Sequence, residues 1–272
     1  MDRSSEEHAA GVEVPSSDSV RRIWSIDIGN SFAKIARFAT LDGQTVRLGD
    51  IMAVPTDRVA AFQPSERGDG IAIASVADPE IARTFGQALT DRGHSVRELG
   101  PGDFGLTLEV EQPDRVGADR VAAVAAALRD ANRPVLVIDS GTAITLDLGV
   151  PGAFCGGLIL PGPQMMLRAL HRQTARLPEL EWTGNASAIY GRSSGEAMRA
   201  GVGGLISLGL PAVVATVRTA FAAARGVDPK SVAVHQSGGG TIPPVADDAI
   251  VAPDLALRGI AAAGIAALGA AN

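Results

Sequence analysis

Two acidic turns, far apart in the sequence, carry residues that could bind phosphate. Asp27 and Asp139 each lie at the end of an apolar run, and small or hydrogen-bonding residues follow them, namely Gly29, Asn30 and Ser31 in the first turn and Gly141 and Thr142 in the second. A carboxylate at the end of a buried strand faces a cleft, and the backbone amides after it are free to meet phosphate oxygens. One such turn is ordinary turn chemistry. Two copies favour a phosphate site.

Hydroxyls and carboxylates are concentrated around the second turn. Thr142 and Thr145 flank it, and Asp147 follows. Nucleotide phosphates with magnesium suit this mixture, because magnesium takes few protein ligands and keeps several waters. Near the first turn, Lys34 could add a positive charge, although a solvated lysine on an alternating strand is an equally good interpretation.

A third candidate is the segment Gly117-Ala118-Asp119-Arg120, which opens a predicted helix. Asp119 could act only as a helix cap. Its place after a glycine-containing loop also suits a general base that accepts the proton of an attacking hydroxyl. Arg120 could hold a substrate carboxylate or steady the transferring phosphate.

Glycine-rich loops add a weaker signal. Ser237-Gly238-Gly239-Gly240 follows a predicted strand, and such backbone is a good surface for a flat adenine ring, although a tight turn would look the same. We assign no role to Cys155, which has no nearby histidine to activate it, or to the four histidines, which lack metal-like spacing.

The elements that must position these residues follow from apolar runs and turn signals. Strand, turn and strand occur at 23–38 and again at 135–148, a repeat that two duplicated lobes would leave. Other expected elements are strands at 71–76, 156–157 and 232–235, and helices at 79–90, 119–129, 164–174, 195–224 and 255–268. This mixture predicts an α/β protein with a disordered tail at 1–22, an N-terminal lobe at 23–113, a C-terminal lobe at 114–272 and a site between the lobes.

Composition limits the partners and the compartment. A net charge of -6 over 272 residues argues against a nucleic-acid or anionic-membrane partner, so bound phosphate must be held locally. One cysteine excludes an intrachain disulfide and fits a reducing cytoplasm. The apolar stretch at 255–268 is interrupted by Arg258 and is shorter than the roughly 20 residues that a bilayer requires, so we expect a buried helix.

Together these motifs resemble type III pantothenate kinases, bacterial enzymes of the first step of coenzyme A synthesis within the actin, sugar kinase and Hsp70 superfamily. The first turn is similar to the family's first phosphate motif, 117–120 to its pantothenate motif and 139–147 to its second phosphate motif. The segments 156–162, 174–178 and 253–259 follow in the family order. The resemblance implies two ribonuclease H-like (actin-like) lobes with a central cleft.

The resemblance also implies a function and a set of roles. The protein would phosphorylate pantothenate with ATP to give 4'-phosphopantothenate, as a cytoplasmic homodimer. Asp119 would be the general base, and pantothenate would be contacted by Gly117, Asp119, Arg120, Thr174 and, from the second subunit, Ser194. Nucleotide and phosphates would be bound by Asp27, Gly29, Asn30, Ser31, Lys34, Gly141, Thr142, Ser237, Gly238 and Gly239. Asp27 would lie near Mg²⁺, and Asp139 would help to hold a monovalent cation, potassium or ammonium.

Three departures from the family pattern leave alternatives open. Val110 stands where an aromatic residue is common, Ser237 replaces the threonine of the adenine motif, and Ser31 and Ser194 replace threonines. A non-catalytic regulatory homologue and a related sugar or acetate kinase therefore remain as second hypotheses.

Overall fold

Two β-sheets make up the protein; they share an order of five strands, and the second has a sixth strand at one edge. The computed structural model describes residues 21–64, 69–184, 189–239 and 242–269. The first sheet has the order β3-β2-β1-β4-β5 and the second the order β11-β10-β7-β8-β9-β6. The first contains β1 (Arg22–Ile28), β2 (Phe32–Leu41), β3 (Gln44–Pro55), β4 (Gly70–Ser75) and β5 (Val96–Glu98). The second contains β6 (Thr107–Leu108), β7 (Val135–Ser140), β8 (Ala143–Val150), β9 (Ala153–Pro161), β10 (Ala233–Ser237) and β11 (Ile250–Val251).

The pairing directions confirm the predicted duplication. In each sheet three consecutive strands form an antiparallel meander, β1 to β3 in one and β7 to β9 in the other. Two further strands then add in parallel beside the first strand of the meander, β4 and β5 in one sheet and β10 and β11 in the other. This is the ribonuclease H-like strand order, present twice, so the predicted fold class is confirmed.

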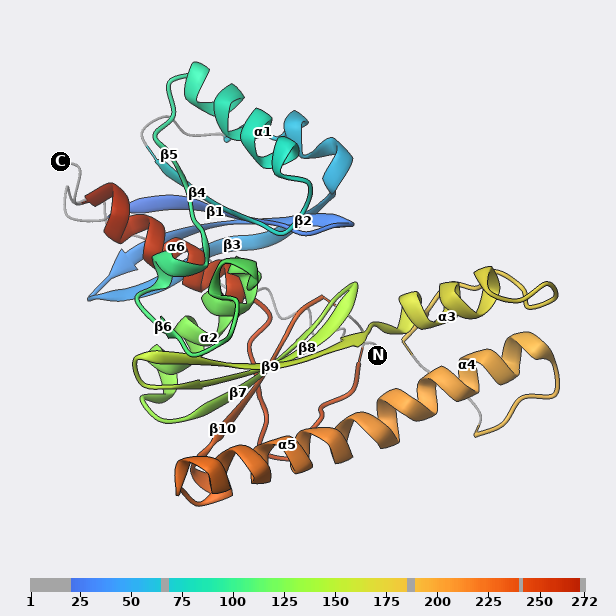
Figure 1. The fold of residues 1–272 in the computed structure, drawn as a ribbon. Helices are drawn as coiled ribbons and strands as arrows, with labels where there is room; N and C mark the ends of the chain where they lie inside the picture. The colour runs from blue at the N-terminus through green and yellow to red at the C-terminus, as the bar shows by residue number, and fades with distance from the viewer. Residues whose placement is uncertain (1–20, 65–68, 185–188, 240–241, 270–272) are drawn as a thin grey trace, which may run out of the picture.

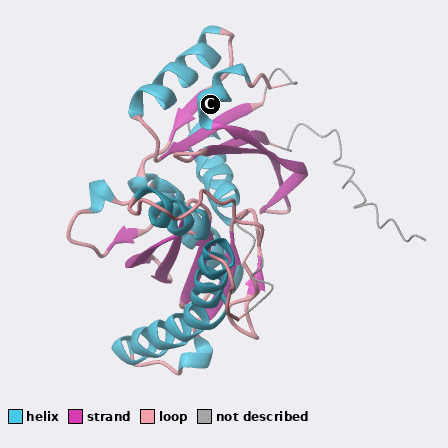
Figure 2. Cartoon of the chain, turned by 90° about the vertical axis from the view of Figure 1, so that its right-hand side faces the viewer, coloured by secondary structure: helices cyan, strands magenta, loops and turns pink. Residues whose placement is uncertain are grey.

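Two helices form the layer between the sheets. These are α2 (Ala118–Ala131) and α6 (Leu255–Gly269), which pack against each other and, on their outer faces, against β7 and β1 (Figures 1 and 2). Ser25 in the first sheet donates a buried hydrogen bond of 2.7 Å to the backbone oxygen of Leu257 in α6. One buried cluster, rich in alanine, joins side chains of both sheets through these helices. The predicted boundary between lobes at residue 113 stays a prediction.

The remaining helices cover the outer faces or project from them. The first sheet carries α1 (Pro79–Asp91), which begins with Asp78 as its cap. From the second sheet α3 (Pro163–Arg172) and α4 (Ser194–Gly204) extend outward together as an arm, and α4 continues through a π-helical turn (Leu205–Gly209) into α5 (Leu210–Arg225) beneath the sheet (Figure 1). Short 3-10 helices lie at Thr56–Ala61, Pro101–Phe104, Pro113–Arg115 and Pro229–Ser231. Most of the predicted tail at 1–22 falls at residues 1–20, which lie outside the described residues. Gly240, at the end of the predicted glycine-rich loop, also lies outside them.

The continuous helix Ser194–Arg225 is long and apolar enough to cross a membrane, by length and composition alone. Only 33% of its most apolar window is buried. Leu205 and Leu208 are exposed on it by 61% and 76%. The sequence predicted this helix at 195–224, and its Ala- and Gly-rich stretch at 201–224 suggested close packing against a partner.

Candidate active site

The two phosphate turns meet across the cleft. Thr142, in the turn between β7 and β8, donates a hydrogen bond of 3.1 Å to the hydroxyl of Ser31, in the turn between β1 and β2. Each turn has the same construction, because β1 pairs with β2 and β7 with β8 as antiparallel hairpins whose first strand carries the Asp near its end. The structure thus brings together two segments that the sequence keeps 111 residues apart.

Three carboxylates approach one another at this junction. Asp27 is buried, and burial together with the charges of Asp119 and Asp139 raises its pKa to about 7, against the opposing charge of Lys34. Burial also raises the pKa of Asp119, and the charge of Asp139 adds to that rise. Because the charges of Asp119 and Asp139 disfavour the ionised form of Asp27, the site has a deficit of positive charge. A bound cation would relieve that deficit.

The geometry of Asp27 fits a metal ion. Its Oδ1 atom is buried without a hydrogen-bond partner in the described part of the chain. Within those residues no three His, Cys, Asp or Glu side chains form a ready-made metal cluster. Magnesium commonly takes one or two carboxylates and completes its shell with water and substrate phosphates, so Asp27 is a suitable ligand. Lys34, half-buried on β2 and paired with Asp27 in the strand register, supplies the nearby positive charge.

The first turn itself is held by the backbone. The Gly29 amide donates to the Phe32 carbonyl at 3.0 Å, and a side chain at Gly29 would press against that same oxygen. Thr56, at the end of β3, donates its hydroxyl to the Gly29 carbonyl at 2.7 Å. Asn30 and Ser31 are exposed at the tip. The sequence analysis gave no role to Thr56, because only the fold brings the end of β3 to this turn.

Asp119 and Arg120 lie in the first turn of α2. Gly117 is the residue that caps this helix, so the capping alternative does not account for Asp119. The Asp119 carboxylate accepts a hydrogen bond of 2.9 Å from the Arg120 backbone amide. A Cβ on Gly117 would approach the Asp119 carboxylate to 2.4 Å and Val76 to 3.2 Å, so a larger residue here would displace the Asp119 side chain. The glycine lets the acid lie against the start of its own helix.

Arg120 is tied to a buried acid. Its Nε and Nη2 both donate to Oδ1 of Asp147, at 2.7 and 2.5 Å. Thr145 donates to the other oxygen of Asp147 at 2.8 Å. Burial raises the pKa of Asp147 to about 6, while hydrogen bonds from Arg120 and Thr145 oppose the rise. The Arg120 guanidinium also lies 5.7 Å from the centre of the Phe154 ring.

The predicted adenine loop touches the second phosphate turn. Gly238 has a φ of 101°, and an added Cβ would lie 2.2 Å from the Ser140 carbonyl and 2.5 Å from the Asp139 carboxylate. Glycine is therefore the only residue that fits this left-handed position without displacing its neighbours. The segment that would carry the base of the nucleotide is thus directly against the segment that would carry its phosphates.

Two clamps that the sequence analysis missed hold the chain after this loop. The amide of buried Gln236 bonds the backbone at Ile242, Pro243 and Val245, at 3.5, 3.2 and 3.0 Å.

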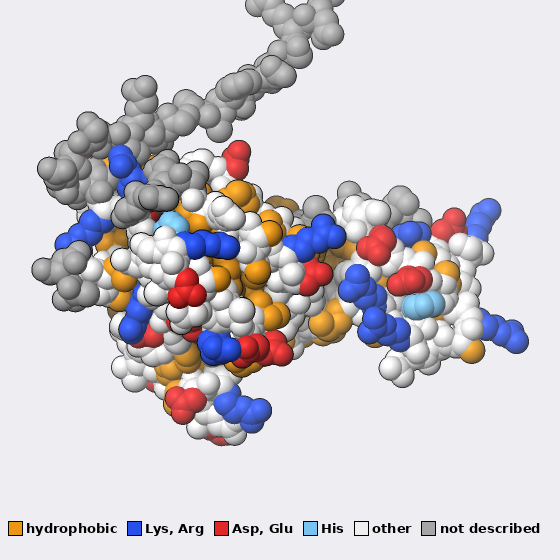
Figure 3. All heavy atoms as spheres, turned by 90° about the horizontal axis from the view of Figure 1, so that it is seen from above, with side chains coloured by type: hydrophobic (Ala, Val, Ile, Leu, Met, Phe, Trp, Pro, Cys, Tyr) orange, Lys and Arg blue, Asp and Glu red, His pale blue; other side chains and the backbone are white. Residues whose placement is uncertain are grey.

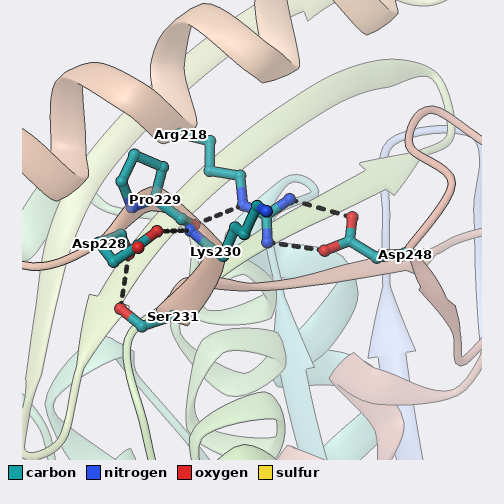
Figure 4. Close-up of polar contacts among 6 residues, drawn as sticks. All are labelled: Arg218, Asp228, Pro229, Lys230, Ser231 and Asp248. Atoms are coloured by element: carbon teal, nitrogen blue, oxygen red, sulfur yellow. Dashed lines mark hydrogen bonds and ion pairs between the residues drawn. The ribbon is translucent and has the colours of Figure 1, made fainter.

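The second clamp comes from α5. Arg218 donates hydrogen bonds to both carboxylate oxygens of Asp248, at 3.0 and 2.7 Å, and to the Pro229 carbonyl, at 2.8 Å (Figure 4). Residues 228–231 are themselves ordered by Asp228, which accepts from the Lys230 amide (Figure 4).

The structure does not bring the other two predicted pantothenate residues to Asp119. Thr174 follows α3 and donates its hydroxyl to the Leu170 carbonyl at 2.8 Å, and Ser194 is the first residue of α4. Both therefore belong to the arm (Figure 1). In the described residues no hydrogen bond or ion pair links either of them to the segment 117–120. Val110 packs near Gly156, where a Cβ would lie 3.5 Å from the Val110 side chain.

Basic and acidic side chains are interspersed on the face seen in Figure 3. Side chains of both charges are mixed over this whole face. That face therefore does not present the continuous basic area that a nucleic-acid backbone attracts.

Comparisons of the sequence and of the fold with known proteins found several similar proteins. Residues 23–218 match the sequence model of the type III pantothenate kinase family. The type III pantothenate kinase of Sphingopyxis alaskensis is 36% identical over 199 residues, which cover 66% of this chain and 75% of that protein. The type III pantothenate kinase of Stenotrophomonas maltophilia K279a is 32% identical over 248 residues, which cover 88% of this chain and 95% of that protein. A structure from Campylobacter jejuni, described as a Baf family transcriptional activator, shares the fold with a TM-score of 0.55 and 20% identity, covering 91% of this chain and 99% of that one.

Proposed function

The chain belongs to the type III pantothenate kinase family, and we propose that Asp119 is the general base of its reaction. As a member of that family it is an ATP-dependent kinase that phosphorylates pantothenate to 4'-phosphopantothenate, in coenzyme A biosynthesis. This assignment sets aside a sugar or acetate kinase. The observation that supports the residue roles is the convergence of Asp27, Asp119 and Asp139 at the junction of the two turns.

The proposed chemistry begins with the proton. A carboxylate of Asp119 accepts the proton of the primary hydroxyl of pantothenate as that oxygen attacks the γ-phosphorus of ATP, and ADP leaves. The raised pKa of Asp119 suits this role, because a base works best when its pKa lies near the working pH. Phosphoryl transfer needs mostly positioning and charge neutralisation, which the backbone amides of Asn30, Ser31 and Thr142 and the Lys34 ammonium provide.

Two cations complete the proposed site. Asp27 holds Mg²⁺, which when bound neutralises charge on the β- and γ-phosphates. Asp139 contributes to a site for potassium or ammonium. Adenine lies on the loop Ser237, Gly238 and Gly239, a position supported by the packing of Gly238 against Asp139.

The arm is the part of the chain that we expect to reach the second subunit of a homodimer. Thr174 and Ser194 lie on the arm and not beside Asp119 in the same chain, so a homodimer in which each arm reaches the partner's cleft would complete the pantothenate pocket. The exposed leucines at 205 and 208 and a shallow depression lined by Ala215, Thr216, Thr219, Ala220 and Ala223 give that dimer an apolar helical face. Burial of this helix against its counterpart in the dimer would explain why Ser194–Arg225 is long and apolar in a cytoplasmic enzyme that does not enter a membrane.

One assay tests the function. Purified protein is incubated with ATP, Mg²⁺ and pantothenate, with and without potassium, and ADP and phosphopantothenate are both quantified. Equal amounts of the two products support the kinase, and potassium should increase the rate. Tight binding of both substrates without product would instead favour the regulatory homologue that Val110 and Ser237 suggested.

A further inference from the structure

Arg120 leaves one edge of its guanidinium unused. The Nε and Nη2 edge is bound by Asp147, whose other oxygen is bound by Thr145. Among the residues that the structure describes, no hydrogen bond is made to Nη1. The side chain of Asp147 is 1% exposed and that of Arg120 is 15% exposed, so the pair is largely buried with one side near the surface.

A purely structural ion pair is a poor explanation for this arrangement. Removing two charges from water costs more than a packed apolar pair would, so a buried pair adds little stability for its own sake. The pair also lies directly beside Asp119, whose charge acts on Asp147. Thr145 and Phe154 then restrict the acid and the guanidinium further. The result is a planar donor whose orientation is determined by three different elements.

The position of Asp147 along β8 indicates what Arg120 meets. Ala143 begins that strand beside the phosphate turn, and Asp147 lies four residues further on. At about 3.4 Å per residue of antiparallel strand, this distance is about 14 Å. The acid that holds Arg120 thus lies along the strand away from the phosphate turn, on the other side of Asp119. Pantothenate has its reacting hydroxyl at one end and its carboxylate at the other.

We propose that Asp147 is a positioning residue for substrate recognition: it holds Arg120 so that the free Nη1 edge binds the pantothenate carboxylate while the hydroxyl end lies at Asp119. The inference rests on the proposed function and deepens it. An arginine suits a carboxylate because its fork of donors matches the two oxygens, but only when the fork is held in one orientation. Asp147 provides that orientation and does not itself touch substrate.

A double-mutant cycle tests the proposal. The variants are Asp147→Asn, Arg120→Ala and the two combined. The matched control is Asp130→Asn, which removes an ion pair with Arg258 at the opposite end of the same helix. For each protein the KM for pantothenate, the KM for ATP and the thermal unfolding midpoint are measured.

Asp147→Asn should raise the KM for pantothenate about tenfold, the effect of weakening one charged hydrogen-bond system, with the KM for ATP within about twofold of wild type. In the Arg120→Ala background the same change should add nothing to the KM, because its effect passes through Arg120. Arg120→Ala should lower the unfolding midpoint by leaving Asp147 buried and unpaired, and the second change should restore it. Asp130→Asn should change neither KM.

The proposal would be overturned if the rise in KM for pantothenate in the double variant equalled the product of the rises in the two single variants. An equal rise in the KM for pantothenate and for ATP in Asp147→Asn would also overturn it. Failure of the proposed function is a separate result. If wild type makes no phosphopantothenate, the same cycle is run on pantothenate affinity by calorimetry. Loss of affinity on Asp147→Asn that disappears in the Arg120→Ala background still supports the positioning role, and unchanged affinity rejects it.

Discussion

Gly259 of α6 lies against the backbone of Ala122 in α2 so closely that a Cβ at residue 259 would come 2.0 Å from the Ala122 carbonyl oxygen. This contact sets the spacing of the two helices that separate the sheets. Because α2 begins at the segment that carries Asp119, the same contact also determines how far that acid lies from the phosphate turns. The proposed catalytic geometry thus depends on a position without a side chain.

We expect Gly259→Ala to destabilise the protein by about 1–3 kcal/mol, the usual cost of overpacking a tight interior. Activity should fall at temperatures below unfolding as well, because α2 is displaced. Ala266→Ser, at an exposed position of the same helix, is the control and should shift stability by less than about 0.5 kcal/mol. Thermal and urea unfolding measure both. Equal stability of the two variants would contradict the close contact.

Asp119→Asn should lower kcat by a factor of about 10²–10⁴, the usual contribution of a general base, with the KM for ATP little changed. The amide is of the same size but accepts no proton. Asp114→Asn, at an exposed position of the preceding 3-10 helix, should retain wild-type kinetics. Steady-state assays decide the matter, and a variant with a normal rate would exclude Asp119 as the base.

The raised pKa of Asp27 predicts a pH dependence of stability in the protein without nucleotide or metal. Its folded-state pKa of about 7 lies above the ordinary value of 3.8, so the folded state binds more protons between these limits. Unfolding free energy should therefore decrease as pH rises from about 4 to about 7 and stay low above that window.

Asp27→Asn should flatten this decrease and raise the unfolding midpoint at pH 8 by a few degrees, since about 1 kcal/mol corresponds to roughly 2–4 °C in a protein of this size class. Kinase activity should be lost. Asp91→Asn, on the exposed end of α1, serves as the control. Melting curves from pH 5 to 8 that are identical for wild type and Asp27→Asn would show that ionisation of Asp27 does not destabilise the folded protein.

The clamp between α5 and the chain after the adenine loop should affect nucleotide binding only. Asp248→Asn weakens the two-point contact with Arg218, and we expect the KM for ATP to rise by roughly three- to tenfold with the KM for pantothenate unchanged. Asp247→Asn removes a neighbouring exposed carboxylate and should have no effect. An unchanged KM for ATP in the Asp248 variant would mean that the loop keeps its position without the clamp.

Leu208→Glu should separate the proposed dimer, because a charge on the exposed apolar helix has no partner in a helix pair. Light scattering after size exclusion should give a monomer, and pantothenate turnover should be lost while ATP binding remains. Met52→Glu, at an exposed apolar position of β3, should leave the dimer and the rate intact. A fully active monomer would show that Thr174 and Ser194 of the partner subunit are not needed.

Local patterns were enough to predict the hairpins and most helices. The predicted helices at 79–90 and 119–129 are observed at Pro79–Asp91 and Ala118–Ala131, because their apolar spacing and their first residues are local signals. The strand β3 was missed, since its alternation is weak and it contains Gly49 and ends at Pro55. Its position is set by pairing with β2, which is a tertiary effect.

The site shows the same division. The two turns and the segment 117–120 are recognisable from residue types, but the partners that hold them come from other elements. The contact of Arg120 with Asp147 spans 27 residues and that of Arg218 with Asp248 spans 30. No local sequence pattern predicts such distant pairs. The sequence therefore indicated which side chains could do chemistry, but not which residues hold those side chains in place.

The last helix of the chain has a consequence for biosynthesis. Since α6 packs on β1 and β4, with Gly264 against Ala72 and Ile23, a sheet made early in translation receives part of its apolar cover from residues made much later. While the polypeptide is still attached to the ribosome, that face of the nascent sheet is open to water. A stop codon before Leu255 should accordingly yield insoluble protein, although every proposed catalytic residue would have been made.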